Sequence, residues 1–164
     1  MPSPPLLELV LYQPQIPNNT GTIGRTAAAT GCRLHVVHPI GFSMDEKARR
    51  RAGLDYWNAV DVVEHASWEA FLADAAPERL WLYTARARRP HWDAEFRPGD
   101  HLLFGREADG VPDTVHAWVL ERWGEDHRLG LPMLPDPRMR SLNVSNAVTA
   151  AVYEAIRQIR PPWA

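Results

Sequence analysis

The sequence predicts an α/β fold in which a parallel β-sheet carries helices on both faces. Short apolar runs of strand length alternate along the chain with helix signals, which is the pattern of a parallel α/β sheet. The last helix signal is a long amphipathic stripe. A length of 164 residues with 45% hydrophobic and 23% charged residues is typical of one soluble domain with its own core. We therefore expect residues 1–164 to form a single domain.

The first part of the chain supplies two expected strands around an expected helix. Residues 6–12 form a short apolar run that is typical of a buried strand. Asn18 and Asn19 offer helix-cap side chains, and the Ala-rich segment after them stops at Gly31, a residue suited to a helix end. Residues 34–38 form the second expected strand.

The middle of the chain continues the alternation of strands and helices. Ser67 is placed to cap the helix that follows it, and Pro112 fits the first position of a helix that extends through Val119. The remaining expected elements are a short helix at 45–52, a strand near 59–63, a helix at 68–75, and strands at 80–84, 101–104 and 128–131.

The last helix has the clearest pattern. A proline-rich irregular stretch at 132–137 precedes it. Apolar residues then recur at the spacing of one helix face: Val144, Val148, Ala151, Val152, Ala155, Ile156 and Ile159. In parallel α/β sheets the ligand lies beyond the carboxyl ends of the strands. The segments that follow strands are therefore the places where we expect chemistry.

Composition excludes several classes of protein. A single cysteine, Cys32, excludes an intramolecular disulfide framework and a multi-cysteine metal site, and we expect it in the core. His35 and His38 are three residues apart on a strand, so their rings face opposite ways and do not form a metal site together. No run of 18 apolar residues and no secretory signal are present, so we expect a cytoplasmic protein without a membrane partner.

Positive charge is carried almost entirely by arginine. The formal net charge is −2, which does not by itself indicate a nucleic-acid binder, and Lys47 is the one lysine among 18 basic residues. Guanidinium groups suit phosphate contacts, so clustered arginines could form a local basic face. On composition alone, a codon bias with ordinary surface charge is the favoured explanation. The clusters are Arg49–Arg51, then Arg86, Arg88 and Arg89, then Arg138 and Arg140.

Three motifs concentrate small polar and charged residues. Motif 1 (residues 17–25) opens a helix after the first strand, so free amides face the ligand side and Arg25 can extend over them. Its two glycines, Gly21 and Gly24, are equally explained by close packing. Motif 2 (residues 104–112) places Gly105 at a strand end, where a ligand can approach the backbone, with Glu107 beside it. A plain strand–turn–helix connection is the alternative.

Motif 3 (residues 140–147) starts the last helix with four small polar side chains. Either Ser141 or Asn143 can cap the helix, which leaves the others available for a ligand. An arginine just before exposed amides favours an anionic or ribose-bearing partner. The alternative is that these side chains only cap the helix, with more capping groups than it needs.

The three motifs, in this order and spacing, resemble those of the SPOUT methyltransferases. Residues 11–21, 51–56 and 152–155 narrow the resemblance to bacterial members that methylate the ribose 2′-hydroxyl of tRNA nucleotide 34, a cytidine or a modified uridine. The resemblance covers about residues 9–160. It implies a C-terminal deep trefoil knot that shapes a pocket for S-adenosylmethionine, with no metal. It also implies a homodimer that binds the tRNA anticodon stem-loop without an appended RNA-binding domain.

The resemblance also assigns residues to roles. Arg25, Ser141 and Asn143 correspond to catalytic positions. Because an arginine keeps its proton in most proteins, we expect Arg25 to stabilise the developing alkoxide rather than to act as the base. The implied cofactor contacts are Tyr83, Thr84, Gly105, Glu107, Leu131, Met133, Ser141 and Leu142. Arg106 occupies a position where relatives often carry a small residue or proline. Either Arg138 or Arg140 corresponds to the arginine that precedes the third motif in the family.

Two other functions remain as alternatives. The first is a SPOUT ribose methyltransferase for another tRNA or rRNA site, although relatives with those targets usually carry an RNA-binding extension. The second is a knotted RNA-binding protein without catalysis. The presence of Arg25, Gly105 and Asn143 argues against that loss of activity.

Overall fold

The computed structural model describes residues 3–44 and 55–164. Within them a seven-stranded sheet has the order β3-β2-β1-β6-β4-β7-β5, and every adjacent pair is parallel. The strands are β1 (Glu8–Tyr12), β2 (Arg33–Val37), β3 (Asp61–His65), β4 (Leu80–Tyr83), β5 (Arg89–Pro90), β6 (His101–Phe104) and β7 (Arg128–Gly130). The expected helix at 45–52 and the arginines at 49–51 lie outside the described residues.

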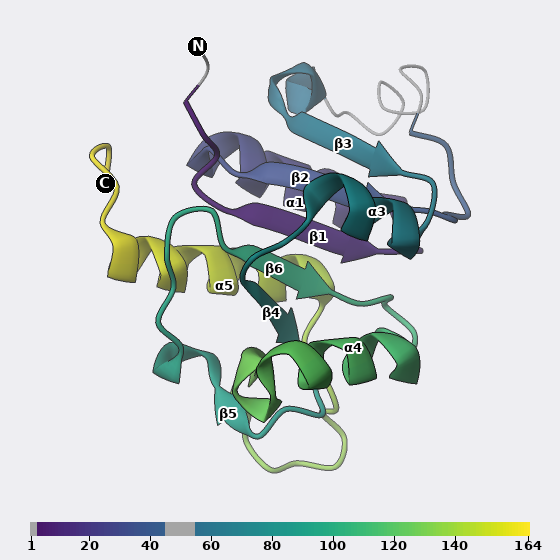
Figure 1. Ribbon diagram of the computed structural model, residues 1–164, viewed down its shortest axis with the longest axis vertical. Coiled ribbons are helices and arrows are strands. Elements are labelled where there is room, and N and C mark those ends of the chain that lie inside the picture. Colours follow the sequence, from purple (N-terminus) through teal and green to yellow (C-terminus); the bar gives the residue numbers. More distant parts are fainter. Residues whose placement is uncertain (1–2, 45–54) are drawn as a thin grey trace.

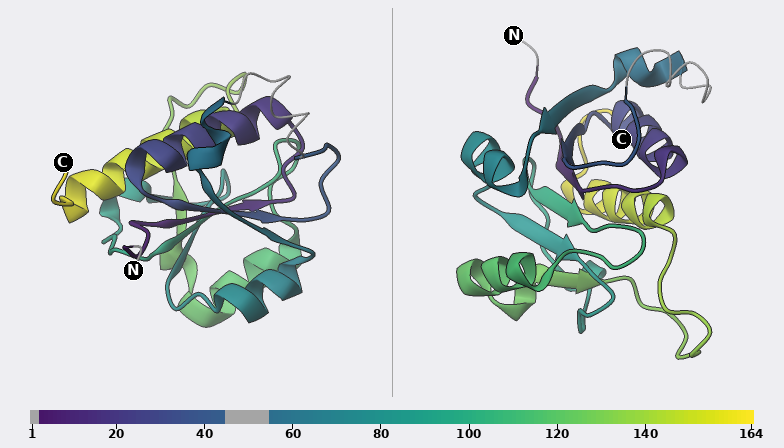
Figure 2. Two further views of the ribbon diagram at one scale, coloured as in Figure 1. Left: turned by 90° about the horizontal axis from the view of Figure 1, so that it is seen from above. Right: turned by 90° about the vertical axis from the view of Figure 1, so that its right-hand side faces the viewer.

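Helices cover both faces of the sheet, as the sequence predicts. Figure 2 shows α1 and α5 together on one face, with α3 and α4 on the other. Their bounds are α1 (Pro17–Thr30), α3 (Trp68–Ala75), α4 (Asp113–Trp123) and α5 (Val144–Ile159), and short 3-10 helices span Asp55–Ala59, His91–Asp93 and Glu125–His127. None of the helices in the described ranges is long and apolar enough to cross a membrane.

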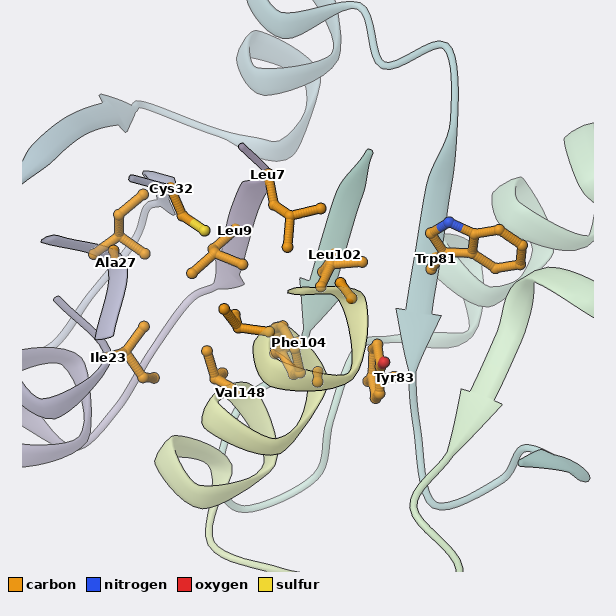
Figure 3. Close-up of a cluster of buried hydrophobic side chains, with 14 of the residues drawn as sticks. Leu7, Leu9, Ile23, Ala27, Cys32, Trp81, Tyr83, Leu102, Phe104 and Val148 are labelled. Carbon is orange, nitrogen blue, oxygen red and sulfur yellow. The ribbon is translucent and has the colours of Figure 1, made fainter. Parts of the chain in front are cut away.

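The two faces of the sheet make two separate hydrophobic cores. On β1, Leu9 and Leu11 pack with α1 and α5, whereas Val10 and Tyr12 pack with α3 and α4. A strand that is buried on both faces must be apolar at successive positions, which explains the uninterrupted apolar run in the sequence. Figure 3 shows the first of these cores, with Phe104 of β6 and Val148 of α5 close together. Cys32 is 4% exposed in this core, as predicted.

The C-terminal end of α1 and the N-terminal end of α3 have the capping residues predicted from the sequence. Gly31 follows α1 in the left-handed conformation with a φ of 70°, and its amide closes the helix on the Ala27 carbonyl. The Ser67 hydroxyl accepts a hydrogen bond of 3.0 Å from the amide of Ala70 and so caps α3. Both predictions rest on residues whose local conformational preference matches the position.

Other boundaries differ from the prediction. The strand expected near 59–63 is β3 at Asp61–His65, because it pairs in register with β2 and a 3-10 helix ends at Ala59. Pro112 is the residue before α4 rather than its first residue, and the helix continues four residues beyond Val119 to Trp123. Helix α1 starts at Pro17, so Asn18 and Asn19 lie inside it and do not cap it.

Candidate functional site

A cavity of about 830 Å³ lies where β4, β6 and β7 end. This volume is within the range of small-molecule sites, and the position beyond the carboxyl ends of parallel strands is where α/β sheets bind ligands. Figure 1 shows the arrowheads of β4 and β6 and, below them, the loop that precedes α5. Four segments supply most of the lining, namely residues 83–90, 104–111, 129–134 and 140–144.

The structure brings the expected cofactor residues together around this cavity. They come from the turn after β4, from motif 2, from the stretch after β7 and from motif 3. The lining contains Tyr83, Thr84, Gly105, Glu107, Leu131, Met133, Ser141 and Leu142, and Asn143 joins them. The Tyr83 hydroxyl lies 3.1 Å from His91 Nδ1, and burial raises the pKa of this phenol. The contacts of these residues with a cofactor remain a prediction.

Gly105 allows motif 2 to fold back on itself. The amide of Arg106 donates to the Gly110 carbonyl at 3.2 Å, and the amide of Gly110 donates to the Arg106 carbonyl at 2.9 Å. A Cβ atom on Gly105 would overlap the backbone of Gly110 and Val111. Close approach of two backbone segments therefore requires glycine here, so motif 2 is a tight turn on the cavity wall and more than a plain connection.

Glu107 caps helix α1 from a distant part of the chain. Its carboxylate accepts hydrogen bonds from the amides of Gln15 at 2.7 Å and Ile16 at 3.1 Å. The residue before the helix, Ile16, has no polar side chain to do so. A negative charge at a helix N-terminus satisfies unpaired amides and is favoured by the helix dipole. Glu107 thus performs the capping that the sequence analysis assigned to Asn18 and Asn19.

Asn19 and Asn143 tie the three motifs to one another. The Asn19 amide donates to Glu107 at 3.4 Å, and its oxygen accepts from Asn143 Nδ2 at 3.0 Å. The Asn143 oxygen accepts from the amides of Ser145 at 2.9 Å and Asn146 at 3.3 Å. Asn143 is therefore the cap of α5, which decides between the two candidates for that role. Ser141 is exposed at the cavity.

Arg106 is held within motif 2 rather than presented as a free cation. Its guanidinium makes two hydrogen bonds to Asp109, at 2.7 and 3.1 Å, and a third to the Gln13 side chain at 2.9 Å. It also lies over the Tyr12 ring, 5.5 Å from the ring centre. The extra charge at this position is thus neutralised by Asp109 and stabilises the turn.

Arg25 is placed apart from the cavity lining of its own chain. It lies on the exposed side of α1, with its guanidinium 5.1 Å from the centre of the Tyr56 ring. The Tyr56 hydroxyl donates to the Gly21 carbonyl at 2.7 Å and so holds the ring against the helix. A Cβ on Gly24 would overlap Trp57, so close packing accounts for that glycine.

The arginines around the cavity differ in what they contact. Arg86 pairs with Asp113 at 2.8 Å, and Arg89 donates to the carbonyls of Asp126 and Asp93. Arg88 and Arg140 line the cavity, and within the described ranges no carboxylate pairs with either. Arg138, the other candidate for the aligned position, pairs with Asp136 at 2.6 Å and is outside the lining. Arg88 and Arg140 are thus the best placed for an anionic ligand.

The capping role of Glu107 predicts a loss of stability in Glu107→Gln. An amide keeps the shape but removes the charge and one acceptor oxygen, so we expect a decrease of about 1–3 kcal/mol in the free energy of unfolding. Urea denaturation measures it. Glu78→Gln is the matched control, because Glu78 is exposed. Equal stability of the two variants would show that the contacts of Glu107 with α1 contribute nothing.

Sequence reasoning missed Asn19 as the link between the motifs. Motif 1 contains the residue, but a local cap is the simplest role for an asparagine next to a helix start. The signal that could have found the link is Pro17, which is favoured in the first turn of a helix and leaves Asn18 and Asn19 inside it. A buried asparagine within a helix needs polar partners from elsewhere in the fold.

Comparisons with known proteins agree with this arrangement. The family model described as the SpoU rRNA Methylase family matches residues 6–153. A curated tRNA (cytidine(34)-2′-O)-methyltransferase of Saccharophagus degradans is 46% identical over 94% of this chain and 96% of its own length. A solved structure described as "Structural insights into the 2-OH methylation of C/U34 on tRNA" has a TM-score of 0.82 at 45% identity, covering 98% of this chain and 94% of that one.

A more distant structure contains a bound cofactor. It is the SpoU methyltransferase AviRb of Streptomyces viridochromogenes in complex with AdoMet, with a TM-score of 0.73 at 27% identity. The match covers 95% of this chain and 61% of AviRb. The family model and the 46% identical relative each span most of this sequence. The chain therefore belongs to the SpoU rRNA methylase family.

Proposed function

We propose that this protein transfers a methyl group from S-adenosylmethionine to the ribose 2′-hydroxyl of tRNA nucleotide 34, a cytidine or a modified uridine. The observation that carries the proposal is the cavity at the strand ends, where motifs 2 and 3 meet and Asn19 joins them to motif 1. Relatives named for this reaction match nearly the whole chain at 41–47% identity. The matched lengths cover 93–97% of this chain.

The cavity fits S-adenosylmethionine in size and in lining. Apolar walls come from Phe104, Leu129 and Leu131, and the tight turn at Gly105 brings backbone groups to the rim. We assign cofactor contacts to the eight lining residues predicted from the sequence. Ser141 is exposed at the mouth, where it is placed to orient a ribose or the methionine end.

The reaction is an in-line displacement at a carbon atom. S-adenosylmethionine supplies an electrophilic methyl group on a positively charged sulfur. The 2′-oxygen forms a bond to the methyl carbon, the carbon–sulfur bond breaks, and the hydroxyl proton passes to solvent or a neighbouring base. The protein must align the two reacting atoms at about 3–3.5 Å, which lowers the barrier by several kcal/mol. We assign Arg25 to the developing alkoxide and the adjacent phosphate.

A homodimer completes this site in our proposal. Arg25 lies outside the cavity lining of its own chain, so a second copy is needed to bring such a guanidinium to the nucleotide. Exposed apolar side chains on the same part of the molecule support an interface: Ile16 and Leu142 beside the cavity are 46% and 45% exposed, and Tyr153 of α5 is 53% exposed. The anticodon stem-loop would then bind across the two subunits.

We also propose that residues 1–164 form one methyltransferase domain whose C-terminal part is knotted. Strand β7 lies between β4 and β5, both of which precede it in the chain, so the later segment enters the sheet between earlier ones. Helix α5 then packs against α1 on the opposite face from α4. These features support a threaded C-terminal segment.

The function is tested by methyl transfer to bulk tRNA. Labelled S-adenosylmethionine is incubated with the protein and an unfractionated tRNA pool from cells that lack this methylation, and the modified nucleotide is mapped. We expect label on the ribose of nucleotide 34. Label confined to other positions would support a SPOUT enzyme with another target. Cofactor binding without any transfer to tRNA or rRNA would support a non-catalytic RNA-binding protein.

Arg88 and Arg140 are expected to contact tRNA phosphates. Replacing either by serine should weaken tRNA binding and lower the slope of log affinity against log salt by roughly one, because each lost contact releases one counterion fewer. Filter binding at several salt concentrations measures both quantities. Arg97→Ser is the matched control, since it removes an exposed charge away from the cavity. An unchanged slope in Arg88→Ser and Arg140→Ser would contradict the assignment.

A further inference from the structure

A cluster of acidic and histidine side chains lies toward the amino-terminal ends of the central strands, away from the cavity. Glu8 and His101 are the first residues of the paired central strands β1 and β6, and His35 is on the adjacent strand β2. All three side chains point to the face that α3 covers, where Phe71 packs against both imidazole rings. The cofactor cavity lies at the opposite, carboxyl ends of these strands. Methyl transfer makes no use of this group.

The donor atoms of these three residues are close to one another. One ligand atom from each of Glu8, His35 and His101 lies within 4.8 Å of the other two. Because Zn²⁺ binds nitrogen and oxygen at about 2.0–2.2 Å, small side-chain movements of roughly 1 Å or less would bring all three into contact with one ion. His35 is 4% and His101 8% exposed, and the Glu8 side chain at 14% connects the group to solvent.

The imidazole of His101 carries a nitrogen without a hydrogen-bond partner among the described residues. Its Nδ1 is buried and, within the described ranges, forms no hydrogen bond. A buried polar atom without a partner is uncommon and needs an explanation. In the tautomer that carries its proton on Nε2, this Nδ1 has a lone pair available for a cation.

His35 is oriented by residues on both sides. Its Nε2 lies 2.7 Å from Glu8 Oε2, a distance at which the nitrogen donates a proton to the carboxylate. Its Nδ1 lies 2.9 Å from His65 Nε2, and His65 Nδ1 lies 3.5 Å from the Asp74 carboxylate. Once a cation replaces the proton on Nε2, His35 keeps its one proton on Nδ1 and donates it to His65 Nε2, with His65 protonated on the nitrogen that faces Asp74. Histidine ligands of metals are typically fixed in this way.

The nearby Arg33 guanidinium contacts the other oxygen of Glu8 and not the one that faces His35. The Arg33 guanidinium lies 3.5 Å from Oε1, the oxygen that does not face His35, and makes a shorter contact of 2.9 Å with Asp61. Glu8 therefore presents Oε2 to His35.

We propose that Glu8, His35 and His101 bind a divalent transition-metal cation, with Zn²⁺ favoured by two imidazole nitrogens and one carboxylate oxygen. The ion would take the place of the proton between His35 and Glu8, which passes to solvent, and water would be the fourth ligand. The bound ion would join the three central strands β2, β1 and β6. Its role would be structural, since the site is at the far end of the strands from the cavity.

Zinc titration of the full-length, tag-free protein tests the proposal. After treatment with EDTA and removal of the chelator, we expect calorimetry to show one Zn²⁺ bound per chain and the melting temperature to rise. Co²⁺ in place of Zn²⁺ should give the visible absorption of a four-coordinate nitrogen–oxygen site. Absence of stoichiometric Zn²⁺ binding to the wild-type protein would overturn the proposal.

Two variants separate this site from adventitious binding. His101→Phe removes a ligand and keeps an aromatic ring against Phe71, and we expect its Zn²⁺ affinity to fall roughly 100-fold or more. His38→Gln is the matched control: His38 follows the carboxyl end of β2 and pairs with Glu64, away from the three ligands, so wild-type affinity is expected. Loss of binding in His38→Gln with retention in His101→Phe would refute the site. If His101→Phe does not fold, Glu8→Gln replaces it with the same expectation.

Discussion

Arg25→Ala is expected to abolish most methyl transfer to tRNA while the affinity for S-adenosylmethionine stays at the wild-type value. Arg25 contacts the Tyr56 ring on the exposed side of α1 and is outside the cavity lining, so its removal leaves the pocket unchanged. Loss of a single group that stabilises developing negative charge typically costs about 10²–10³ in rate. Single-turnover transfer of labelled methyl and calorimetric binding of the cofactor measure the two quantities.

Arg157→Ala is the matched control for Arg25→Ala. Arg157 is also an exposed arginine on a helix of the same face, where it pairs with Glu154. We expect wild-type turnover from this variant, which would show that the loss in Arg25→Ala depends on position and not on net charge. Substantial turnover by Arg25→Ala would eliminate both the alkoxide-stabilising role and a role as base.

The environment of Arg25 favours stabilisation over proton removal. Within the described ranges its guanidinium contacts the Tyr56 ring, and no carboxylate forms an ion pair with it. An arginine that serves as a base would need a partner able to accept its proton in turn, because guanidinium groups hold theirs strongly. A guanidinium that stacks on an aromatic ring leaves its N–H groups available to donate hydrogen bonds to oxygen atoms of the substrate.

The elements that could be predicted from the sequence are those whose signal is local. The apolar stripe predicted for the last helix runs from Val144 to Ile159 and coincides with α5, and Asn143 is one of the two caps predicted for it, because both signals lie within one stretch of chain. Strand β6 is predicted with its correct bounds, since both faces are buried and the apolar run ends at Gly105. Strand β5 could not be predicted, because two residues, Arg89 and Pro90, carry no periodicity and pair with β7 only once the sheet is assembled.

In the candidate site too, features with a local sequence signal could be predicted, and contacts between distant residues could not. The motifs indicate which residues line the cavity, because small residues at strand ends have a local meaning. Their partners could not be predicted: Glu107 caps a helix about 90 positions earlier in the chain, and His35 meets Glu8 and His65 from neighbouring strands. The spacing of His35 and His38 correctly separates those two rings. Contacts across strands depend on strand order and register, which spacing alone does not contain.

Gly105→Ala is expected to remove most of the affinity for S-adenosylmethionine. The added methyl group would overlap the backbone of Gly110 and Val111, and backbone atoms cannot avoid it by a rotamer change. Either the end of β6 or the turn of motif 2 must move, and both are walls of the cavity. Forcing an extra methyl group into a packed site costs about 1–3 kcal/mol. Such a cost weakens binding by roughly five- to 150-fold.

Gly41→Ala separates this steric effect from a general cost of replacing glycine. A Cβ on Gly41 meets no atom within 4 Å, so we expect wild-type cofactor affinity and thermal stability from that variant. Calorimetric titration measures binding for both proteins, and circular dichroism establishes that Gly105→Ala is folded. Because β6 is a central strand between β1 and β4, displacement of the turn is the less costly response and would leave the sheet intact. Wild-type affinity in folded Gly105→Ala would place the cofactor away from motif 2.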